Sequence, residues 1–143
     1  MSAPNARAGQ PATAAALRVG LLCLTAVQLV VGMWTLAFPA SFYNDVPTVD
    51  WTPPYSEHLF RDFGSTTVGI GIVLTAAAIW LERRLVLVAL LAYLAYSISH
   101  LAFHAHHLNP ESPSLSALLL AVTILSVLLP FALLPAALKL KVT

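Results

Sequence analysis

Four long apolar stretches follow one another along the chain, separated by short polar segments. They cover residues 19–38, 57–81, 85–107 and 115–138. Each is close to the ~20 residues that a helix needs to cross ~30 Å of hydrocarbon. Backbone groups find no water to bond in lipid, so spans of this kind form helices. The pattern therefore predicts an all-α membrane protein, with four transmembrane helices in an up-down-up-down bundle.

The composition agrees with this reading of the pattern. The 143 residues are 59% hydrophobic and 9% charged, whereas a soluble domain has about 25% charged residues. The formal net charge of +1 leaves no basic patch, which argues against a nucleic-acid partner. The expected partner is the lipid bilayer. Because so small a bundle leaves much of each helix facing outward, a homo-oligomer or a place in a larger membrane complex is a further expectation.

The cationic residues predict the orientation of the spans. All but Arg61 fall at one end of a four-span arrangement: Arg7, Arg18, Arg83, Arg84, Lys139 and Lys141. By the positive-inside rule, both termini are expected to be cytoplasmic. Residues 1–18 are expected to form a flexible cytoplasmic tail and 139–143 a cytoplasmic end. A cleaved secretory signal is disfavoured, because the first apolar run is long and Pro39 falls inside the candidate cleavage site.

The segment from Pro39 to Ser56 is too long for a tight turn and is rich in proline and aromatic residues. Tyrosine and tryptophan suit the headgroup layer of a membrane. We favour an interfacial belt for this segment. The alternative is a lid over the outer mouth of the bundle.

The second span begins with two polar pairs at helical spacing. Glu57 and Arg61 are four residues apart, and so are His58 and Asp62, so each pair stacks on one side of a helix. An acid beside a histidine fixes the tautomer of the imidazole and leaves its other nitrogen free to bind or react.

The third span carries a longer polar stripe. With about 100° per residue, one face presents Tyr93, Tyr96, Ser97, His100, His104 and His107 over ~21 Å of helix. His106 projects away from this face. A turn of two or three residues around Glu82 makes the second and third helices antiparallel neighbours. We therefore expect Glu57, His58, Arg61 and Asp62 to face the histidines of the third span in one outward-facing site.

Several chemistries suit such a site. His58, His100, His104 and His107 are candidate ligands of a transition metal, because imidazole suits zinc, copper, iron and nickel. Facing histidines can also ligate haem. Tyrosine and histidine can instead donate hydrogen bonds to a quinone, and a Glu–His–Asp network can move protons without a metal. Membrane hydroxylases with a di-iron centre are excluded, because they need about eight histidines and the chain has five.

Other functions stay open beside these. The polar network around a ligand would consist of Glu57, Arg61, Asp62, Tyr93 and Tyr96. In a small membrane enzyme, histidine and glutamate would instead carry out acid–base chemistry. In the alternative, the whole cluster only holds helices together. The chain would then be a small accessory subunit of a larger membrane complex.

Three motifs carry a resemblance to a known group of proteins. They are Phe42-Tyr43-Asn44-Asp45, Glu57-His58-x-x-Arg61-Asp62-x-Gly64 and His100-Leu101-x-x-His104-x-x-His107. In these motifs, and in length, the chain resembles small, uncharacterised bacterial integral membrane proteins of the actinobacterial type. The resemblance implies a four-helix inner-membrane protein with the same polar positions. It implies no activity.

Overall fold

The computed structural model describes residues 9–51 and 54–141. Within them the chain forms α1 (Gly9–Ala37), α2 (Pro39–Asp45), the short 3-10 helix η1 (Val49–Trp51), α3 (Glu57–Trp80), α4 (Arg83–His106) and α5 (Pro113–Leu138), and no strand. The four long helices are long and apolar enough to cross a membrane. The predicted all-α class with four candidate spans is confirmed.

Local chemistry sets most of the helix boundaries near the predicted positions. The Ser56 hydroxyl accepts a hydrogen bond from the Leu59 amide and begins α3. The Glu82 carboxylate caps α4 by accepting from the Arg84 and Leu85 amides. Between them Leu81 ends α3 in the left-handed conformation, with φ of 48°. This two-residue connection makes α3 and α4 sequential antiparallel helices.

The first helix differs from its prediction. It begins at Gly9, whereas the sequence pattern placed the start of the span at Val19 and a flexible tail over residues 1–18. The segment from Gly9 to Arg18 is rich in alanine, the strongest helix former, so the helix continues past the hydrocarbon-length stretch. The rest of the predicted tail, residues 1–8, lies outside the described residues.

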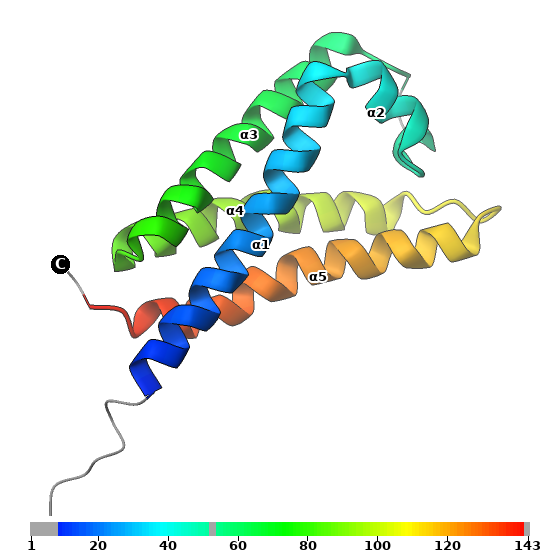
Figure 1. Ribbon diagram of the computed structural model, residues 1–143. Coiled ribbons are helices and arrows are strands. Elements are labelled where there is room, and N and C mark those ends of the chain that lie inside the picture. Colours follow the sequence, from blue (N-terminus) through cyan, green and yellow to red (C-terminus); the bar gives the residue numbers. More distant parts are fainter. Residues whose placement is uncertain (1–8, 52–53, 142–143) are drawn as a thin grey trace, which may run out of the picture.

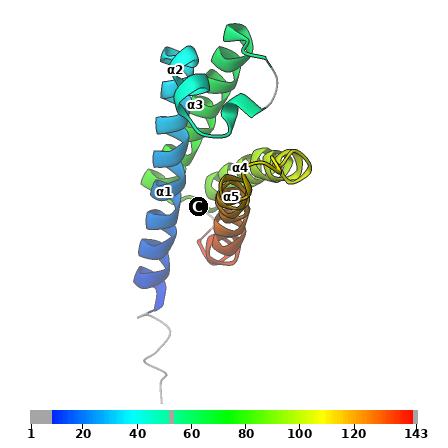
Figure 2. The same ribbon diagram turned by 90° about the vertical axis from the view of Figure 1, so that its right-hand side faces the viewer.

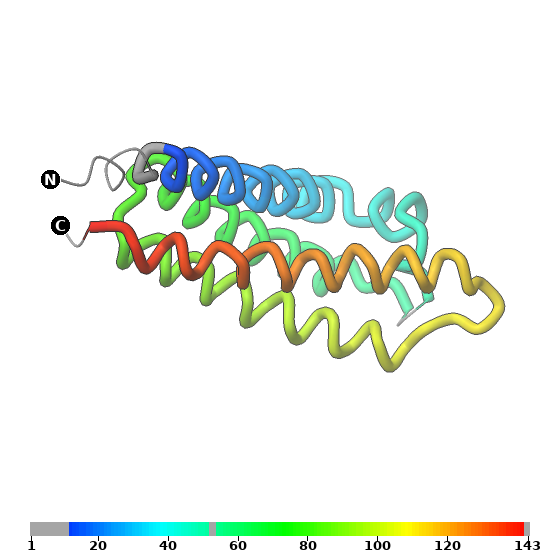
Figure 3. Tube along the Cα trace, turned by 90° about the horizontal axis from the view of Figure 1, so that it is seen from below, coloured from blue at the N-terminus to red at the C-terminus, as the bar shows by residue number. Residues whose placement is uncertain are grey.

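The helices associate as two antiparallel pairs (Figures 1 and 2). Helix α1 packs mainly on α3, and α4 mainly on α5. The start of α1, the α3–α4 turn and the end of α5 lie together, as Figure 3 shows; we call this the turn end. The opposite end holds α2 and the α4–α5 connection, and we call it the loop end. The two pairs are close at the turn end and diverge toward the loop end (Figure 1).

The apolar core explains where the two pairs meet. Leu17, Leu21 and Leu24 of α1 form one buried cluster with side chains of the other three long helices: Leu74, Ala77, Ala78, Val86, Ala89, Leu90, Tyr93 and Ala137. These positions fall in the half of each helix nearer the turn end, except Leu24, which lies at the middle of α1. The pairs are therefore held together at that end, and the cluster stops at the level of Leu24 and Tyr93.

Small residues let α1 and α3 approach closely. A Cβ atom added to Gly64 would lie 2.5 Å from the Leu36 amide nitrogen and 2.9 Å from the Gly32 carbonyl oxygen. Farther toward the turn end, a Cβ on Gly71 would lie 2.7 Å from Leu29 Cδ2. The contact at Gly64 needs glycine, because only a residue without a side chain lets two helix backbones touch; at Gly71 the neighbour is the Leu29 side chain.

Two arginines brace this pair at opposite ends. Arg18 Nε in α1 donates to the Ala78 carbonyl in the last turn of α3, at 3.0 Å. Arg61 Nη1 in α3 donates to the Leu36 carbonyl in the last turn of α1, at 2.7 Å. The last carbonyls of a helix have no partner within it and carry the negative end of the helix dipole. Each helix thus supplies an arginine that donates a hydrogen bond to a terminal carbonyl of the other helix.

The segment between α1 and α3 folds onto these two helices. Phe42 of α2 is buried and its ring contacts Trp34 of α1 and Phe60 of α3, with centroids 5.6 and 6.3 Å apart. Tyr43 and Tyr55 complete the aromatic cluster around Phe60. Among the described elements, α2 contacts α1, η1 and α3. The aromatic segment therefore covers the loop end of one helix pair and does not reach α4.

Candidate functional site

The two polar pairs predicted on α3 are present. Arg61 Nη2 lies 2.8 Å from Glu57 Oε1, and Arg61 Nε donates to the same oxygen at 2.8 Å. His58 Nε2 lies 3.3 Å from Asp62 Oδ2. The His58 and Asp62 side chains are 88% and 62% exposed. These pairs form because residues four apart on a helix are neighbours.

The prediction that these pairs face the histidines of α4 is wrong. The α3 side chain that touches the α4 stripe is Phe63, whose ring centroid lies 6.2 Å from that of Tyr96. Asp62 projects about 100° from Phe63 around the helix and His58 about 140°. Both therefore point away from α4. Arg61 turns to the end of α1 instead and holds Glu57 beside it.

Four rings of the predicted stripe on α4, those of Tyr93, Tyr96, His100 and His104, form a ladder. Tyr96 stacks on His100 at 5.3 Å and 22°, and His100 meets His104 edge-to-face at 4.4 Å and 81°. Tyr93 contacts Tyr96 at 6.2 Å on the side nearer the turn end. The ladder begins inside the core at Tyr93 and continues toward the loop end, where the two helix pairs diverge (Figure 2).

Burial decreases along the ladder. Tyr93 is buried, Tyr96, His100 and His104 are half-buried, and His107, one turn beyond the ladder, is exposed. Neither the His100 ring nor the His104 ring has a hydrogen bond with another described residue. Both therefore keep a donor and an acceptor nitrogen for something other than the chain.

His107 is held differently from the other stripe histidines. Its ring stacks on Phe103 at 4.1 Å, and its Nδ1 lies 2.7 Å from the Phe103 carbonyl oxygen. Because a carbonyl oxygen only accepts, Nδ1 carries the proton and Nε2 is the free nitrogen. His106 is exposed and, as predicted, has no part in the ladder.

The described residues contain no group of three or more His, Cys, Asp or Glu side chains that could hold a metal ion. All five histidines, all six acids and Cys23 of the sequence are among the described residues. His58 is separated from the stripe, and His107 stacks on Phe103. One chain therefore offers an adjacent imidazole pair, His100 and His104, in place of the predicted four-histidine set.

Two further polar side chains lie in the interior and were missed in the sequence. Gln28 and Thr25 of α1 are 2% and 7% exposed, and the Gln28 Nε2 and Thr25 Oγ1 atoms have no hydrogen-bond partner in the described structure. The sequence feature that could have indicated them is Gln28, a single side-chain amide within an apolar span. The neighbouring buried hydroxyls of Thr67 and Ser97 instead bond to carbonyls of their own helices.

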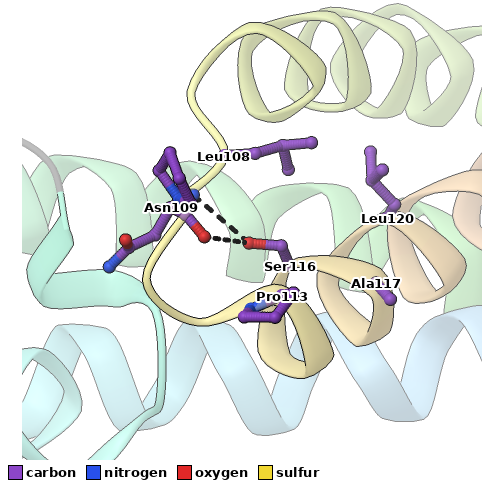
Figure 4. Close-up of a pocket in the computed structure, with 7 residues that line it drawn as sticks. Leu108, Asn109, Pro113, Ser116, Ala117 and Leu120 are labelled. Atoms are coloured by element: carbon purple, nitrogen blue, oxygen red, sulfur yellow. Dashed lines mark hydrogen bonds between the residues drawn. The ribbon is translucent and has the colours of Figure 1, made fainter.

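A separate shallow pocket lies at the loop end, where α4 connects to α5 (Figure 4). Its lining is largely apolar: Leu108, Asn109, Pro110, Pro113, Ser116, Ala117 and Leu120. The Ser116 hydroxyl is already engaged, because it donates to the Asn109 carbonyl at 3.0 Å and accepts from the Asn109 amide at 3.2 Å. No histidine lines this pocket, and the Asn109–Ser116 hydrogen bonds beside it close the α4–α5 connection.

No family model, curated protein or solved structure matches the chain. The function is therefore argued from the α4 ladder and its surroundings.

Proposed function

We propose that this chain is a multi-pass membrane protein that binds a small uncharged ligand on α4, at Tyr96, His100 and His104. The observation that carries the proposal is the pair of half-buried imidazoles without a hydrogen-bond partner among the described residues. Lipid tails cannot bond to such groups, and an unpaired polar group away from water is costly. A bound ligand with donors or acceptors would remove that cost.

The charges around the ladder favour a neutral ligand. The ion pairs nearest in the fold, Glu57–Arg61 and His58–Asp62, are on faces of α3 that point elsewhere. No salt bridge among the described residues involves a residue of α4. A charged ligand would need an opposite charge at the site, and the ladder provides aromatic faces and imidazole nitrogens instead.

The orientation is part of the same proposal. With the turn end in the cytoplasm, the ladder lies in the outer half of a bacterial inner membrane and both termini are cytoplasmic. The support is the distribution of cationic residues, which gathers Arg18, Arg83, Arg84, Lys139 and Lys141 at the turn end as the positive-inside rule requires.

The test is to identify what co-purifies with the protein. Full-length protein, purified in detergent without chelators, would be extracted and examined by mass spectrometry for organic compounds, with elemental analysis and an absorption spectrum on the same sample. We expect a near-stoichiometric organic compound. It should be lost from His100→Leu and His104→Leu and kept by His106→Leu, the matched control on the same helix.

Three other outcomes would overturn the proposal. A stoichiometric metal or a Soret band, lost with the same two substitutions, would identify a metal or haem site. Retention of the compound by both variants would place its binding elsewhere. If no compound is found and His100→Leu only lowers the abundance of a larger complex that contains the chain, the accessory-subunit alternative is correct.

A further inference from the structure

The arginine at the start of α4 lies against the protein instead of projecting freely from it. Arg83 is half-buried, whereas Arg84, the next residue, is exposed. The contact between Phe63 and Tyr96 shows which face of α4 meets α3. Arg83 lies about 140° from Tyr96 around the helix, so it is turned away from α3.

The face of α4 that carries Arg83 is the one that packs on α5. Leu87, Leu90 and Leu94 continue the stripe of Arg83 at helical spacing, and all three are half-buried or buried. Among the described elements α4 contacts only α3 and α5, and α5 is its main partner. Arg83 therefore lies at the turn end of the interface between α4 and α5.

The chain after α5 brings two lysines to the same end of this helix pair. Leu140 packs against the core cluster, as does Leu85 in the first turn of α4, and this contact holds the chain after α5 at the turn end (Figure 3). Lys139 and Lys141 flank Leu140 and are exposed. Three positive charges therefore lie at the turn end of the α4–α5 pair.

No acidic side chain balances these charges. Both salt bridges among the described residues lie within α3, and none of the three cationic side chains has a hydrogen bond with another described residue. The one acid at the turn end, Glu82, uses both carboxylate oxygens to cap α4. A guanidinium that is partly removed from water without an opposite charge is costly, and an anion from outside the chain would offset that cost.

The turn end lies at the level of the lipid headgroups whichever way the chain is oriented. Only Leu81 and Glu82 separate the two spans α3 and α4, so the turn stays close to the bilayer surface. Trp80, at the end of α3, is 69% exposed, and tryptophan is enriched at this level of a membrane. The anions that are concentrated in this layer are the phosphodiesters of anionic phospholipids.

From these observations we propose that Arg83, Lys139 and Lys141 form a binding site for the headgroup of an anionic phospholipid. The planar guanidinium of Arg83 donates two parallel hydrogen bonds to phosphate oxygens, and the lysines add positive charge. The acyl chains lie along α5, whose surface is apolar and largely exposed. A zwitterionic lipid carries the same phosphate, but its ammonium group repels the lysines. The site is at the opposite end of α4 from the ladder and does not depend on the proposed function.

The experiment measures lipid binding to the full chain in detergent by native mass spectrometry, with phosphatidylglycerol and with phosphatidylcholine of the same acyl chains. We expect one tightly bound phosphatidylglycerol per chain and weaker binding of phosphatidylcholine. Arg83→Met should weaken phosphatidylglycerol binding about 10-fold or more, the effect of a lost charged hydrogen bond. Arg84→Met removes the same charge from the exposed neighbour and should weaken binding about 3-fold or less.

Further variants separate charge from geometry. Arg83→Lys keeps the charge and loses the planar fork, so its affinity should lie between those of the unaltered protein and Arg83→Met. Lys139→Met changes an exposed side chain and should also weaken binding, whereas His100→Leu should leave it unchanged. Lipid-free Arg83→Met should melt at the same temperature as the unaltered protein or higher, because it has lost a half-buried charge without a partner.

Any of three results contradicts this site. Equal binding of phosphatidylcholine and phosphatidylglycerol would mean that the protein recognises acyl chains alone. Equal weakening by Arg83→Met and Arg84→Met would indicate a diffuse attraction between the turn end and anionic lipid. Displacement of phosphatidylglycerol by an excess of glycerol 1-phosphate would identify a site for a soluble phosphate instead of a lipid.

Discussion

Gly64→Ala tests the close crossing of α1 and α3, and Gly69→Ala on the same helix is its matched control. A Cβ on Gly64 would lie 2.5 Å from a backbone nitrogen and 2.8 Å from the Cα of Leu36, whereas a Cβ on Gly69 has nothing within 4 Å. The atoms that Gly64→Ala meets belong to backbone, so no side-chain rotation can relieve the overlap. The two helices must separate.

The two substitutions should have opposite signs. Alanine in place of glycine in an exposed helix interior gains about 0.5–1 kcal/mol, so Gly69→Ala should stabilise the protein slightly. Overpacking costs about 1–3 kcal/mol, and separation of the helices also stretches the 2.7 Å bond from Arg61 to the Leu36 carbonyl. Because both variants gain the same helix propensity, their free energies of unfolding should differ by the overpacking cost of about 1–3 kcal/mol, increased by the weakening of the Arg61 bond.

Reversible unfolding in mixed detergent micelles, followed by circular dichroism against the mole fraction of denaturing detergent, measures this difference. Equal effects of the two substitutions would refute the reasoning, since helix propensity alone treats the two glycines alike. A Gly64→Ala protein as stable as Gly69→Ala would mean that the α1–α3 crossing is looser than the described contact.

Two further predictions concern the arginine brace and the orientation. Arg61→Met should lower the free energy of unfolding by about 1–2 kcal/mol, because the charged hydrogen bond to the Leu36 carbonyl is lost. The Arg61 side chain is 46% exposed, so its ion pair with Glu57 contributes little. Arg84→Met is the control, and an equal loss of stability there would contradict the role of Arg61. In a Cys23→Ser background, Ser112→Cys should react with an impermeant thiol reagent added outside intact cells while Lys141→Cys should not, and the reverse labelling would invert the proposed topology.

Much of the fold could be predicted because it depends on local features of the sequence. Span lengths follow from hydropathy, and the pairs Glu57–Arg61 and His58–Asp62 follow from helical spacing. The α4 ladder follows from the same periodicity. The early start of α1 was missed because a hydropathy limit marks the edge of the hydrocarbon, while an alanine-rich helix continues beyond it.

The relative placement of the helices could not be predicted in the same way. Helical periodicity says which residues share a face, but not which face meets a neighbour. Phe63, and not Asp62 or His58, takes the contact with Tyr96, so the two polar clusters do not join. The closest approach of α1 and α3 is at Gly64, because it depends on which residue of α1, Gly32, lies opposite.

The brace between α1 and α3 imposes an order on biogenesis. α1 is synthesised first, so it meets lipid before α3 exists to cover it. Until then its last carbonyls lack Arg61, Gln28 and Thr25 face the bilayer, and the backbone at Gly32 has no partner. Once α3 inserts, its Arg61 reaches the Leu36 carbonyl while Arg18 closes on Ala78 at the other end. A nascent chain that stalls before α3 therefore displays polar groups in lipid, a feature that membrane quality-control proteases can recognise, and completion of this helix pair commits the chain to its folded form.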